Sequence, residues 1–332
     1  MTCRICNNEK DNKSYVVREM FFGTKEEVGY FQCSSCGCLQ IGVVPEDMGR
    51  YYPDGYYSFG SIDETSPVRR LKNLLRASRN RYKLFGQGLL GKMLERTRPG
   101  DMTLGLIAGT GNIKEMSILD VGCGSGMLLY QLREVGLRDL LGIDPFIAGD
   151  ILYRNGLKVL KKSLHGLRKE AGRKFDLVMF NHSFEHMPGP AAVLEDAASV
   201  LSESGILMIR IPTVSSFAWE HYRTDWVQLD APRHLFLHSV GSMELLAKKA
   251  GFELTGMVYD STGFQFWGSE QYKRDIPLES PRSFKNGLSS SIFSSAEIEE
   301  FSRRAVELNR ENRGDMAAFY LKKKAPTRHS TA

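Results

Sequence analysis

The sequence predicts an α/β protein with a doubly wound, mostly parallel sheet, preceded by a small cysteine-rich module. From Ser117 onward, short apolar runs alternate with amphipathic segments. This pattern is typical of a parallel sheet with helices on both faces. Five of the six cysteines lie before residue 39. The 332 residues are enough for one large domain and one appended module.

The composition is that of a globular protein, with 42% hydrophobic and 25% charged residues. No apolar run approaches the ~18 residues that a membrane-spanning helix needs. The N-terminal stretch "MTCRICNNEK" has no apolar core of the kind found in signal peptides. We therefore expect a cytoplasmic protein, in a reducing compartment, with no transmembrane segment.

Residues 1–45 carry the cysteine module. Cys3-x-x-Cys6 is followed, after 26 residues, by Cys33-x-x-Cys36-x-Cys38. Clustered cysteines in a reducing compartment favour metal over disulfides. We expect a zinc-ribbon-like module in which Cys3, Cys6, Cys33 and Cys36 hold a structural zinc ion. Cys38 could replace Cys36, and a set of reduced, buried cysteines without metal is the alternative.

Residues 46–100 form the next predicted segment. It begins with the turn-rich aromatic stretch "YYPDGYYSFG" and continues as a helical pattern over residues 66–98. Ten Lys or Arg and a single acid, Glu95, lie between Arg69 and Arg98. We expect helices that pack on the main domain. Contact with an anionic substrate or a membrane surface is the alternative.

Residues 101–325 form the predicted main domain, and residues 326–332 a disordered tail. A capping box, Ser294-x-x-Glu297, starts the last predicted helix. The other helices are expected at residues 126–135, 146–155, 190–202 and 239–250. The seven strands expected in a Rossmann-like sheet are 117–121, 139–144, 157–160, 175–180, 205–211, 252–260 and 316–323.

A glycine-rich turn, "LDVGCGSG", follows the first of these strands. Gly122, Gly124 and Gly126 allow a tight turn and a close approach of helix amides to a ligand. Met127 replaces the last glycine of a dinucleotide fingerprint. Asp120 would repel a diphosphate but suits an ammonium group. Asp144, at the end of the second strand, suits two ribose hydroxyls.

S-Adenosylmethionine carries both an ammonium group and a ribose, and it is the cofactor that we expect. The alternative is that Asp120 and Asp144 merely cap helices. Residues 117–260 resemble a class I S-adenosylmethionine-dependent methyltransferase, through "LDVGCGSG", "GIDP" and "FDLVMFNHSFEHM". The third strand departs from that family, because "LKVLKKSLHG" offers no acid for the adenine amino group.

The cysteine module followed by "YYPDGYY" is similar to the N-terminal layout of bacterial sugar and polysaccharide methyltransferases. This resemblance implies methyl transfer to a sugar, nucleotide-linked or in a polysaccharide, at oxygen or carbon. One alternative is a methyltransferase of a quinol- or lipid-type small molecule. Another is a zinc-ribbon nucleic-acid-binding protein with an RNA methyltransferase domain. The stretch "NHSFEH" disfavours nucleic acid, because it replaces the target-base motif after the fourth strand.

The polar residues after that fourth strand are the expected catalytic group. In an open parallel sheet, ligands bind at the carboxyl ends of the strands. We expect Asn181 to contact the cofactor and His186 to act as general base, with Glu185 as its orienting partner or as a substrate contact. His182 and His234 are the alternative bases, and a purely structural role is the competing interpretation. A base with an ordinary histidine pKa would make activity fall near pH ~6.5.

Overall fold

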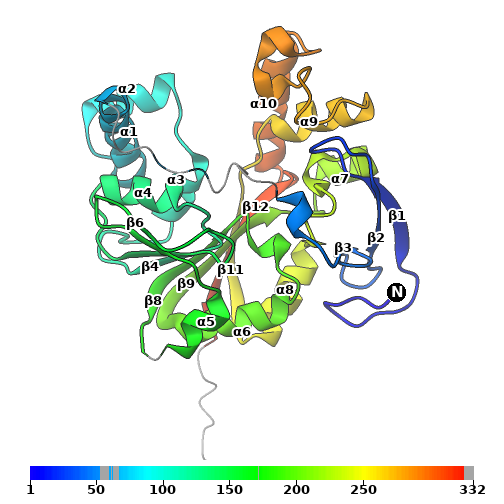
Figure 1. Ribbon diagram of the computed structural model, residues 1–332, viewed down its shortest axis with the longest axis horizontal. Helices are drawn as coiled ribbons and strands as arrows, with labels where there is room; N and C mark the ends of the chain where they lie inside the picture. The colour runs from blue at the N-terminus through cyan, green and yellow to red at the C-terminus, as the bar shows by residue number, and fades with distance from the viewer. Residues whose placement is uncertain (53–59, 61, 63–66, 171, 325–332) are drawn as a thin grey trace, which may run out of the picture. The chain divides into compact units, whose positions relative to one another are not determined.

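The computed structural model describes residues 1–52, 60, 62, 67–170 and 172–324 (Figure 1). Most of the aromatic stretch of the predicted linker and all of the predicted disordered tail lie outside these residues. The chain forms two compact units. Unit 1 comprises Met1–Pro53, Phe184–Leu194 and Arg210–Phe319, and unit 2 comprises Asp54–Ser183, Glu195–Ile209 and Tyr320–Ala332. Each unit is built from three separate segments, so the units do not test the predicted domain boundaries. Those boundaries stay predictions.

The central sheet has eight strands in the order β11-β12-β9-β8-β4-β5-β7-β6 (Figure 1). β4 pairs in parallel with β5 and β8, and β5 pairs in parallel with β7. The predicted α/β fold and all seven predicted strands are confirmed, and β6 is an addition that pairs antiparallel with β7. The bounds are β4 Ile118–Val121, β5 Leu140–Ile143, β6 Ile151–Leu152, β7 Lys158–Leu160, β8 Phe175–Asn181, β9 Leu201–Pro212, β11 Phe252–Tyr259 and β12 Met316–Lys323.

The central strands are apolar along their whole length because the sheet is covered on both faces. Every residue of β4 (ILDV) and of β5 (LLGI) is buried, including the polar Asp120. Strands buried on two faces read as continuous hydrophobic runs rather than as an alternation. Asp120 is therefore a buried acid in an otherwise apolar strand, and this position suggests a functional role.

The helices largely follow the expected pattern. Gly86 and Gly88, both with positive φ, divide the predicted 66–98 helix into two. Ser294 and Glu297 form the predicted capping box. The bounds are α1 Pro67–Phe85, α2 Leu89–Thr97, α3 Met102–Ala108, α4 Met127–Glu134, α5 Leu164–Lys169, α6 Pro190–Val200, α7 Phe217–Tyr222, α8 Val240–Lys249, α9 Phe264–Lys273 and α10 Ser295–Arg310.

The helix predicted over residues 146–155 is wrong. This stretch contains β6 and turns. Pro145 precedes it, Gly149 interrupts it, and Gly156 adopts a φ of 82° immediately after it. The backbone of Lys161 donates to the Asp150 carboxylate at 2.7 Å, which fastens the segment beside β7. Ile147 is buried in this loop, whereas Leu152 of β6 is 71% exposed. Among the described residues, no helix is long and apolar enough to cross a membrane.

The cysteine module is part of a second sheet, with the strand order β1-β2-β3-β10. β1 (Lys13–Arg18), β2 (Glu27–Gln32), β3 (Leu39–Ile41) and β10 (Phe236–Leu237) pair antiparallel. In the last pair, Phe236 lies opposite Gln40 and Leu237 opposite Leu39. A strand from late in the chain thus completes the N-terminal sheet, and unit 1 is a single packed body.

Trp226 anchors the interior of unit 1. Its side chain is fully buried, and its indole Nε1 donates to Asp315 Oδ2 at 2.9 Å. Asp315 is also buried, and burial raises the pKa of its carboxyl group to about 6. A lost donor in such a site is expensive because water cannot replace it.

We predict that Trp226→Phe lowers the free energy of unfolding by about 1–3 kcal/mol, since a buried carboxyl oxygen loses its donor. Urea unfolding of the full chain measures this. Trp267→Phe, at a half-buried tryptophan on α9, is the matched control and should cost less. Equal losses in the two variants would show that ring volume, and not the hydrogen bond, sets the cost.

Candidate active site and metal centre

The glycine turn joins β4 to α4 in unit 2. Gly122, Gly124 and Gly126 have φ values of 74°, 55° and 79°. A Cβ on Gly122 would lie 2.6 Å from Ser183 Cβ, and one on Gly126 would lie 2.6 Å from Val159 Cγ2. Side chains are excluded at these two positions by backbone conformation and by space. The turn therefore packs closely on the neighbouring strands.

Asp144 ties this turn to the end of β5. Its Oδ2 accepts from the Gly124 backbone N–H at 2.9 Å, and its Oδ1 accepts from the Phe146 N–H at 2.8 Å. The residue is buried. A carboxylate has about four lone-pair positions, so two backbone bonds leave room for two hydroxyl donors. The predicted ribose-binding residue is thus placed at the turn.

Asp120 is the buried acid of β4. Its Oδ1 has no hydrogen-bond partner among the described residues. Burial, together with the charge of Asp144, raises the pKa of Asp120 to about 7. A buried acceptor without a donor is costly unless a ligand supplies one. An ammonium group at this point would satisfy the oxygen and favour the ionised form, so the site fits the cationic end of S-adenosylmethionine.

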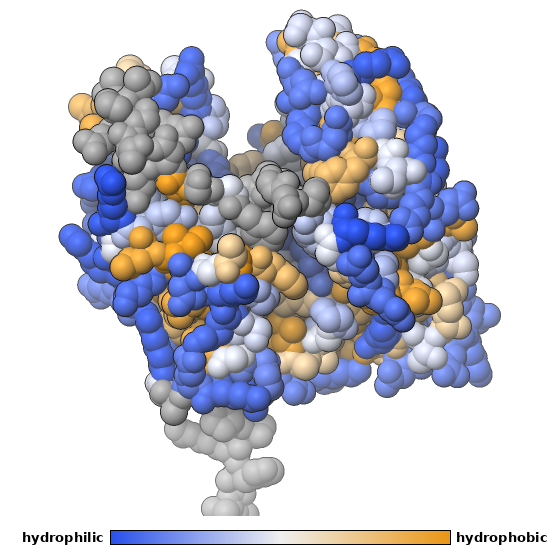
Figure 2. Space-filling model, in the orientation of Figure 1, coloured by the Kyte–Doolittle hydropathy of each residue, from blue (hydrophilic) through white to orange (hydrophobic). Residues whose placement is uncertain are grey.

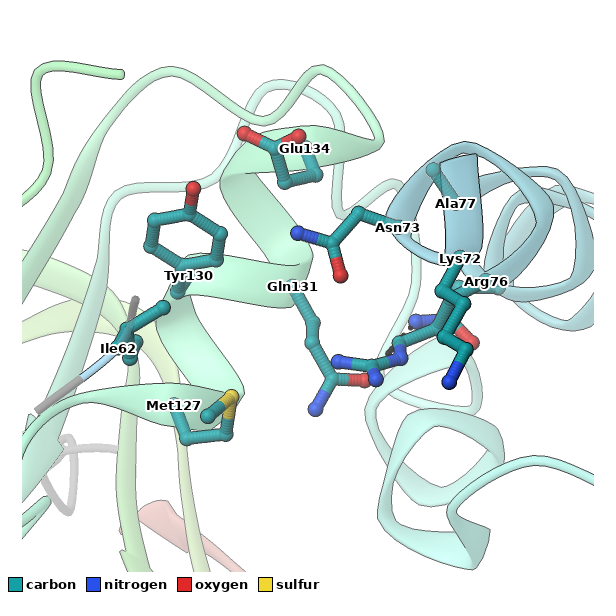
Figure 3. A pocket seen from close by; sticks show the side chains of 10 residues that line it. Ile62, Lys72, Asn73, Arg76, Ala77, Met127, Tyr130, Gln131 and Glu134 are labelled. Atoms are coloured by element: carbon teal, nitrogen blue, oxygen red, sulfur yellow. Dashed lines mark hydrogen bonds between the residues drawn. The ribbon is translucent and has the colours of Figure 1, made fainter. Parts of the chain in front are cut away.

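A cavity of about 250 Å³ lies between α1 and α4 in unit 2. Asn73 of α1 points toward α4, from which Met127 and Gln131 project (Figure 3). Met127 directly follows the glycine turn, so the cavity adjoins the N-terminal end of α4. It is lined by Ile62, Lys72, Asn73, Arg76, Ala77, Asn80, Met127, Tyr130, Gln131 and Glu134.

The polar residues after β8 form a turn that is fastened to β4. Asn181 is half-buried at the strand end, and His182 is exposed with a φ of 54°. Few non-glycine residues adopt this left-handed conformation, which often marks functional turns. Ser183 Oγ donates to the Val121 carbonyl at 2.6 Å. Ser183 was missed from the sequence, although the polar run of which it is part was the signal.

Two residues further on, Glu185 and His186 meet His234 in unit 1. These three side chains offer donor atoms that lie within 4.8 Å of one another, close enough to share a cation. The rings of His186 and His234 are 4.8 Å apart in an edge-on arrangement. Glu185 Oε1 lies 3.9 Å from His234 Nε2. The predicted base, its predicted orienting partner and one alternative base are therefore brought together.

Backbone carbonyls fix the tautomers of both histidines. His186 Nδ1 lies 2.8 Å from the Arg233 carbonyl, and His234 Nδ1 lies 2.7 Å from the Gln228 carbonyl. A carbonyl only accepts, so each Nδ1 carries the proton and each Nε2 keeps its lone pair. The Tyr52 hydroxyl also approaches His186 Nδ1, at 3.3 Å. The lone pair of His186 is therefore on Nε2.

Burial dominates the electrostatics of this cluster. It raises the pKa of Glu185 to about 8 and, with the charge of His234, lowers the pKa of His186 to about 3. It also lowers the pKa of His234. Burial by itself would raise the pKa of Asp230. The charges of Arg233 and His234 have the opposite and larger effect, so the pKa of Asp230 is lowered. At neutral pH the imidazoles are therefore neutral and Glu185 is mostly protonated.

Asp230 is the member of this region that the sequence did not reveal. Its Oδ2 lies 3.6 Å from His234 Nε2, and its Oδ1 accepts from Arg233. The i, i+4 spacing of acid and histidine in "DAPRH" was the available signal. The group of donor atoms within 4.8 Å forms without His182, whose candidate role stays a prediction.

Four cysteines of unit 1 form a second cluster. The sulfurs of Cys3, Cys6, Cys33 and Cys36 lie within 4.8 Å of one another. Cys3 Sγ is 3.6 Å from Cys36 Sγ, and Cys6 Sγ is 3.4 Å from Cys33 Sγ. Sulfurs in a tetrahedron around zinc, with ~2.3 Å bonds, would be ~3.8 Å apart. The donor set and spacing therefore fit a structural zinc ion.

Further groups around the sulfurs stabilise a thiolate at Cys3, whereas the hydrogen bond shared with Cys3 raises the pKa of Cys36. Gln40 Nε2 donates to Cys3 Sγ at 3.1 Å, and the Ile5 N–H lies 3.4 Å from the same sulfur. Hydrogen bonding with Cys36 is the main cause that lowers the pKa of Cys3 to about 4. Cys38 is fully buried and lies 4.0 Å from His238 Nδ1 instead. Of the two cysteines left open by the sequence, Cys36 is the one in the cluster.

Comparison with known proteins gives one family match. Residues 94–256 match a family model described as "Methyltransferase domain". A ubiquinone biosynthesis O-methyltransferase of Azorhizobium caulinodans is 30% identical over 163 residues, which cover 45% of this chain and 64% of that protein. The corresponding protein of Bordetella avium is 28% identical over 171 residues, covering 44% and 66%. The chain thus spans slightly less than two thirds of these relatives.

A solved structure, a SAM-dependent methyltransferase from Archaeoglobus fulgidus, is 18% identical and aligns over 78% of this chain and all of that one, with a TM-score of 0.40. At that score the likeness supports no further argument. The family match, the two relatives, the sheet order and the glycine turn with its two acids agree with one another. Residues 94–256 are thus similar in sequence to methyltransferase domains, and the α/β sheet and the glycine turn agree with that similarity.

Proposed function

We propose that this protein transfers a methyl group from S-adenosylmethionine to a hydroxyl of a quinol-type small molecule. The observation that carries the cofactor assignment is the buried Oδ1 of Asp120, which has no hydrogen-bond partner in the described part of the chain and lies next to the turn that Asp144 fastens. The quinol-type acceptor is favoured by the names of the relatives, which are ubiquinone biosynthesis O-methyltransferases. These relatives support the quinol-type alternative better than the sugar acceptor that the N-terminal resemblance implied.

The residues that would hold the cofactor come from three strand ends. Asp120 would bind the ammonium group, Asp144 the ribose hydroxyls, and the turn from Gly122 to Gly126 would supply the close backbone surface. Asn181, at the end of β8, is the further cofactor contact. When bound, S-adenosylmethionine supplies an electrophilic methyl group.

The proposed base is His186, with its lone pair on Nε2. It would take the proton of the acceptor hydroxyl while the oxygen attacks the methyl group, which makes the oxygen a better nucleophile. The imidazolium that forms would lie beside Glu185. An ionised Glu185 would stabilise it, and this contact raises the basicity of an imidazole whose resting pKa is depressed by burial.

We further propose a structural zinc ion on Cys3, Cys6, Cys33 and Cys36. The matching spacing of the four sulfurs supports it. Four cysteines close the coordination sphere, so the metal would have no open position for substrate. Its role would be to fix the two cysteine turns against each other and so stabilise the N-terminal segment.

We predict that the full chain binds S-adenosylmethionine and S-adenosylhomocysteine, and that Asp144→Ala weakens both, because two ribose hydroxyls lose their acceptor. Isothermal titration calorimetry measures the affinities. The conservative variant Asp120→Asn should weaken binding through loss of charge. Affinity of the unaltered chain should fall as pH drops below about 7, where Asp120 is protonated, and this dependence should flatten in Asp120→Asn. If the chain binds neither of these two ligands, the cofactor assignment is overturned.

We predict that His186→Ala lowers kcat by about 10² to 10⁴, the usual contribution of a general base, while S-adenosylmethionine still binds. Methyl transfer to a catechol is the assay, with a nucleotide sugar as the competing acceptor. His221→Ala, at an exposed histidine of unit 1, is the matched control. A large loss in His182→Ala or His234→Ala, with His186→Ala near normal, would move the role to that histidine. Transfer to the sugar alone would reject the quinol-type acceptor.

The pH profile is a second readout of the same assignment. With an ordinary histidine as base, the rate would fall below pH ~6.5. We expect this fall at lower pH, because burial lowers the pKa of His186 to about 3. The pKa of Glu185 is raised to about 8, so its stabilising charge is absent below that pH and present above it. The rate should therefore rise through about pH 8, and Glu185→Gln should remove this rise.

We predict about one zinc ion per chain, because one tetrahedral site takes four cysteines. Inductively coupled plasma mass spectrometry of the purified protein measures the content. Cys36→Ser should lose the metal and Cys38→Ser should keep it. A metal-free protein whose N-terminal sheet is protected from proteolysis would contradict the proposal.

A further inference from the structure

We propose that the outer face of α2 docks on an anionic lipid surface. We define this face as Leu89, Leu90, Lys92, Met93 and Arg96. These residues alternate aliphatic and cationic side chains on one nine-residue helix. The inference stands apart from the acceptor proposed above, since it concerns where the protein binds and not what it methylates.

The opposite side of α2 is occupied by α1. Gly91 is the buried residue of α2, and a Cβ there would lie 2.3 Å from the Ser78 carbonyl oxygen and 2.8 Å from Tyr82 Cβ. Glu95, one turn further along, pairs with Lys83 of α1 at 3.1 Å. Residues four apart share a helix face, so Gly91 and Glu95 define the inner side. Leu89 and Met93, about half a turn away, therefore point away from α1.

The apolar part of the outer face is unusually exposed. Leu89 is 88% exposed, Met93 57% and Leu90 48%. Single exposed apolar residues are ordinary, but three on two adjacent turns form a patch that marks an interaction site. Contact with an apolar phase would remove this surface from water.

The charged part of this surface has one sign. Lys92, Arg96 and Arg98 are exposed. Glu95 is the single acid between Arg69 and Arg98, and it is already engaged by Lys83 and Arg79. Figure 2 shows blue hydrophilic atoms over much of the drawn face, with orange apolar atoms among them. A short helix with leucines beside lysine and arginine matches the boundary between lipid tails and anionic headgroups.

The mixture of side chains favours lipid over the other occupants. Single-stranded RNA is held by cations together with aromatic rings on which bases stack, whereas the apolar residues of this face are aliphatic. A second copy of the chain would bring like charges together, because the face has no exposed acid among its residues. No described helix could span a bilayer, so the attachment would be peripheral, with α2 lying in the interface.

The test is co-sedimentation of the full chain with vesicles. We expect binding to phosphatidylcholine vesicles that contain phosphatidylglycerol, little binding to phosphatidylcholine alone, and weakening at high salt. The triple variant Leu89→Gln/Leu90→Gln/Met93→Gln should lose about tenfold or more in partitioning, because glutamine keeps the helix but removes the aliphatic contact. Lys92→Gln/Arg96→Gln should reduce the dependence on phosphatidylglycerol.

The matched control is Val43→Gln. Val43 is 82% exposed and lies in unit 1, so its replacement removes a comparable exposed apolar residue elsewhere, and vesicle binding should not change. Calorimetry with S-adenosylmethionine checks that the α2 variants are folded. If the triple variant no longer binds S-adenosylmethionine, the test rests on Lys92→Gln/Arg96→Gln. Unchanged vesicle binding by that double variant would overturn the proposal.

Three other results would also overturn it. One is no vesicle binding by the unaltered chain. Another is salt-sensitive binding of a tRNA, without vesicle binding, that the triple variant loses. The third is a dimer in sedimentation equilibrium that the triple variant converts to monomer, which would assign the face to a second copy.

Discussion

The short segment from His234 to His238 holds unit 1 together by backbone hydrogen bonds. The Leu235 N–H donates to the Glu185 carbonyl at 2.9 Å, and the Leu235 carbonyl accepts from the Ile41 N–H at 3.0 Å. The Tyr30 hydroxyl donates to the His234 carbonyl at 2.7 Å. Buried backbone groups must be paired, so a change in any of these neighbours shifts the others. The cysteine module, the loop after β8 and the histidine cluster are coupled through this one segment.

That coupling gives the proposed zinc ion an indirect part in catalysis. β3, which follows the last cysteines, pairs with β10, and β10 begins two residues after His234. Lys249 Nζ also donates to the Ile5 carbonyl beside the cysteine cluster, at 2.7 Å. A metal that folds the N-terminal sheet would therefore stabilise the position of the imidazole more than 190 residues later, without contacting substrate.

Burial is the common cause of the unusual protonation states. Asp120 and Glu185 are acids in dry surroundings, and burial raises both pKa values by disfavouring the charged form. The same effect lowers the pKa of His186 because its charged form is the protonated one. The two acids differ in what each would need: Asp120 lies where a ligand cation would restore its charge, whereas Glu185 lies beside a base that gains a proton during the proposed reaction.

The sequence by itself determined the strands, the glycine turn, the two acids at strand ends and the cysteine spacing. These are local properties, because apolar runs, turn glycines and paired cysteines can be recognised from the adjacent residues alone. Only the tertiary structure decided that Cys36 rather than Cys38 joins the sulfur cluster, and that His234 rather than His182 joins Glu185 and His186. It also decided that residues 146–155 fold against β7 instead of forming a helix. The first two outcomes depend on pairings between segments far apart in the chain, which local preference cannot specify. The third depends on the pairing of β6 with the nearby β7, which outweighs the apolar spacing that predicted a helix.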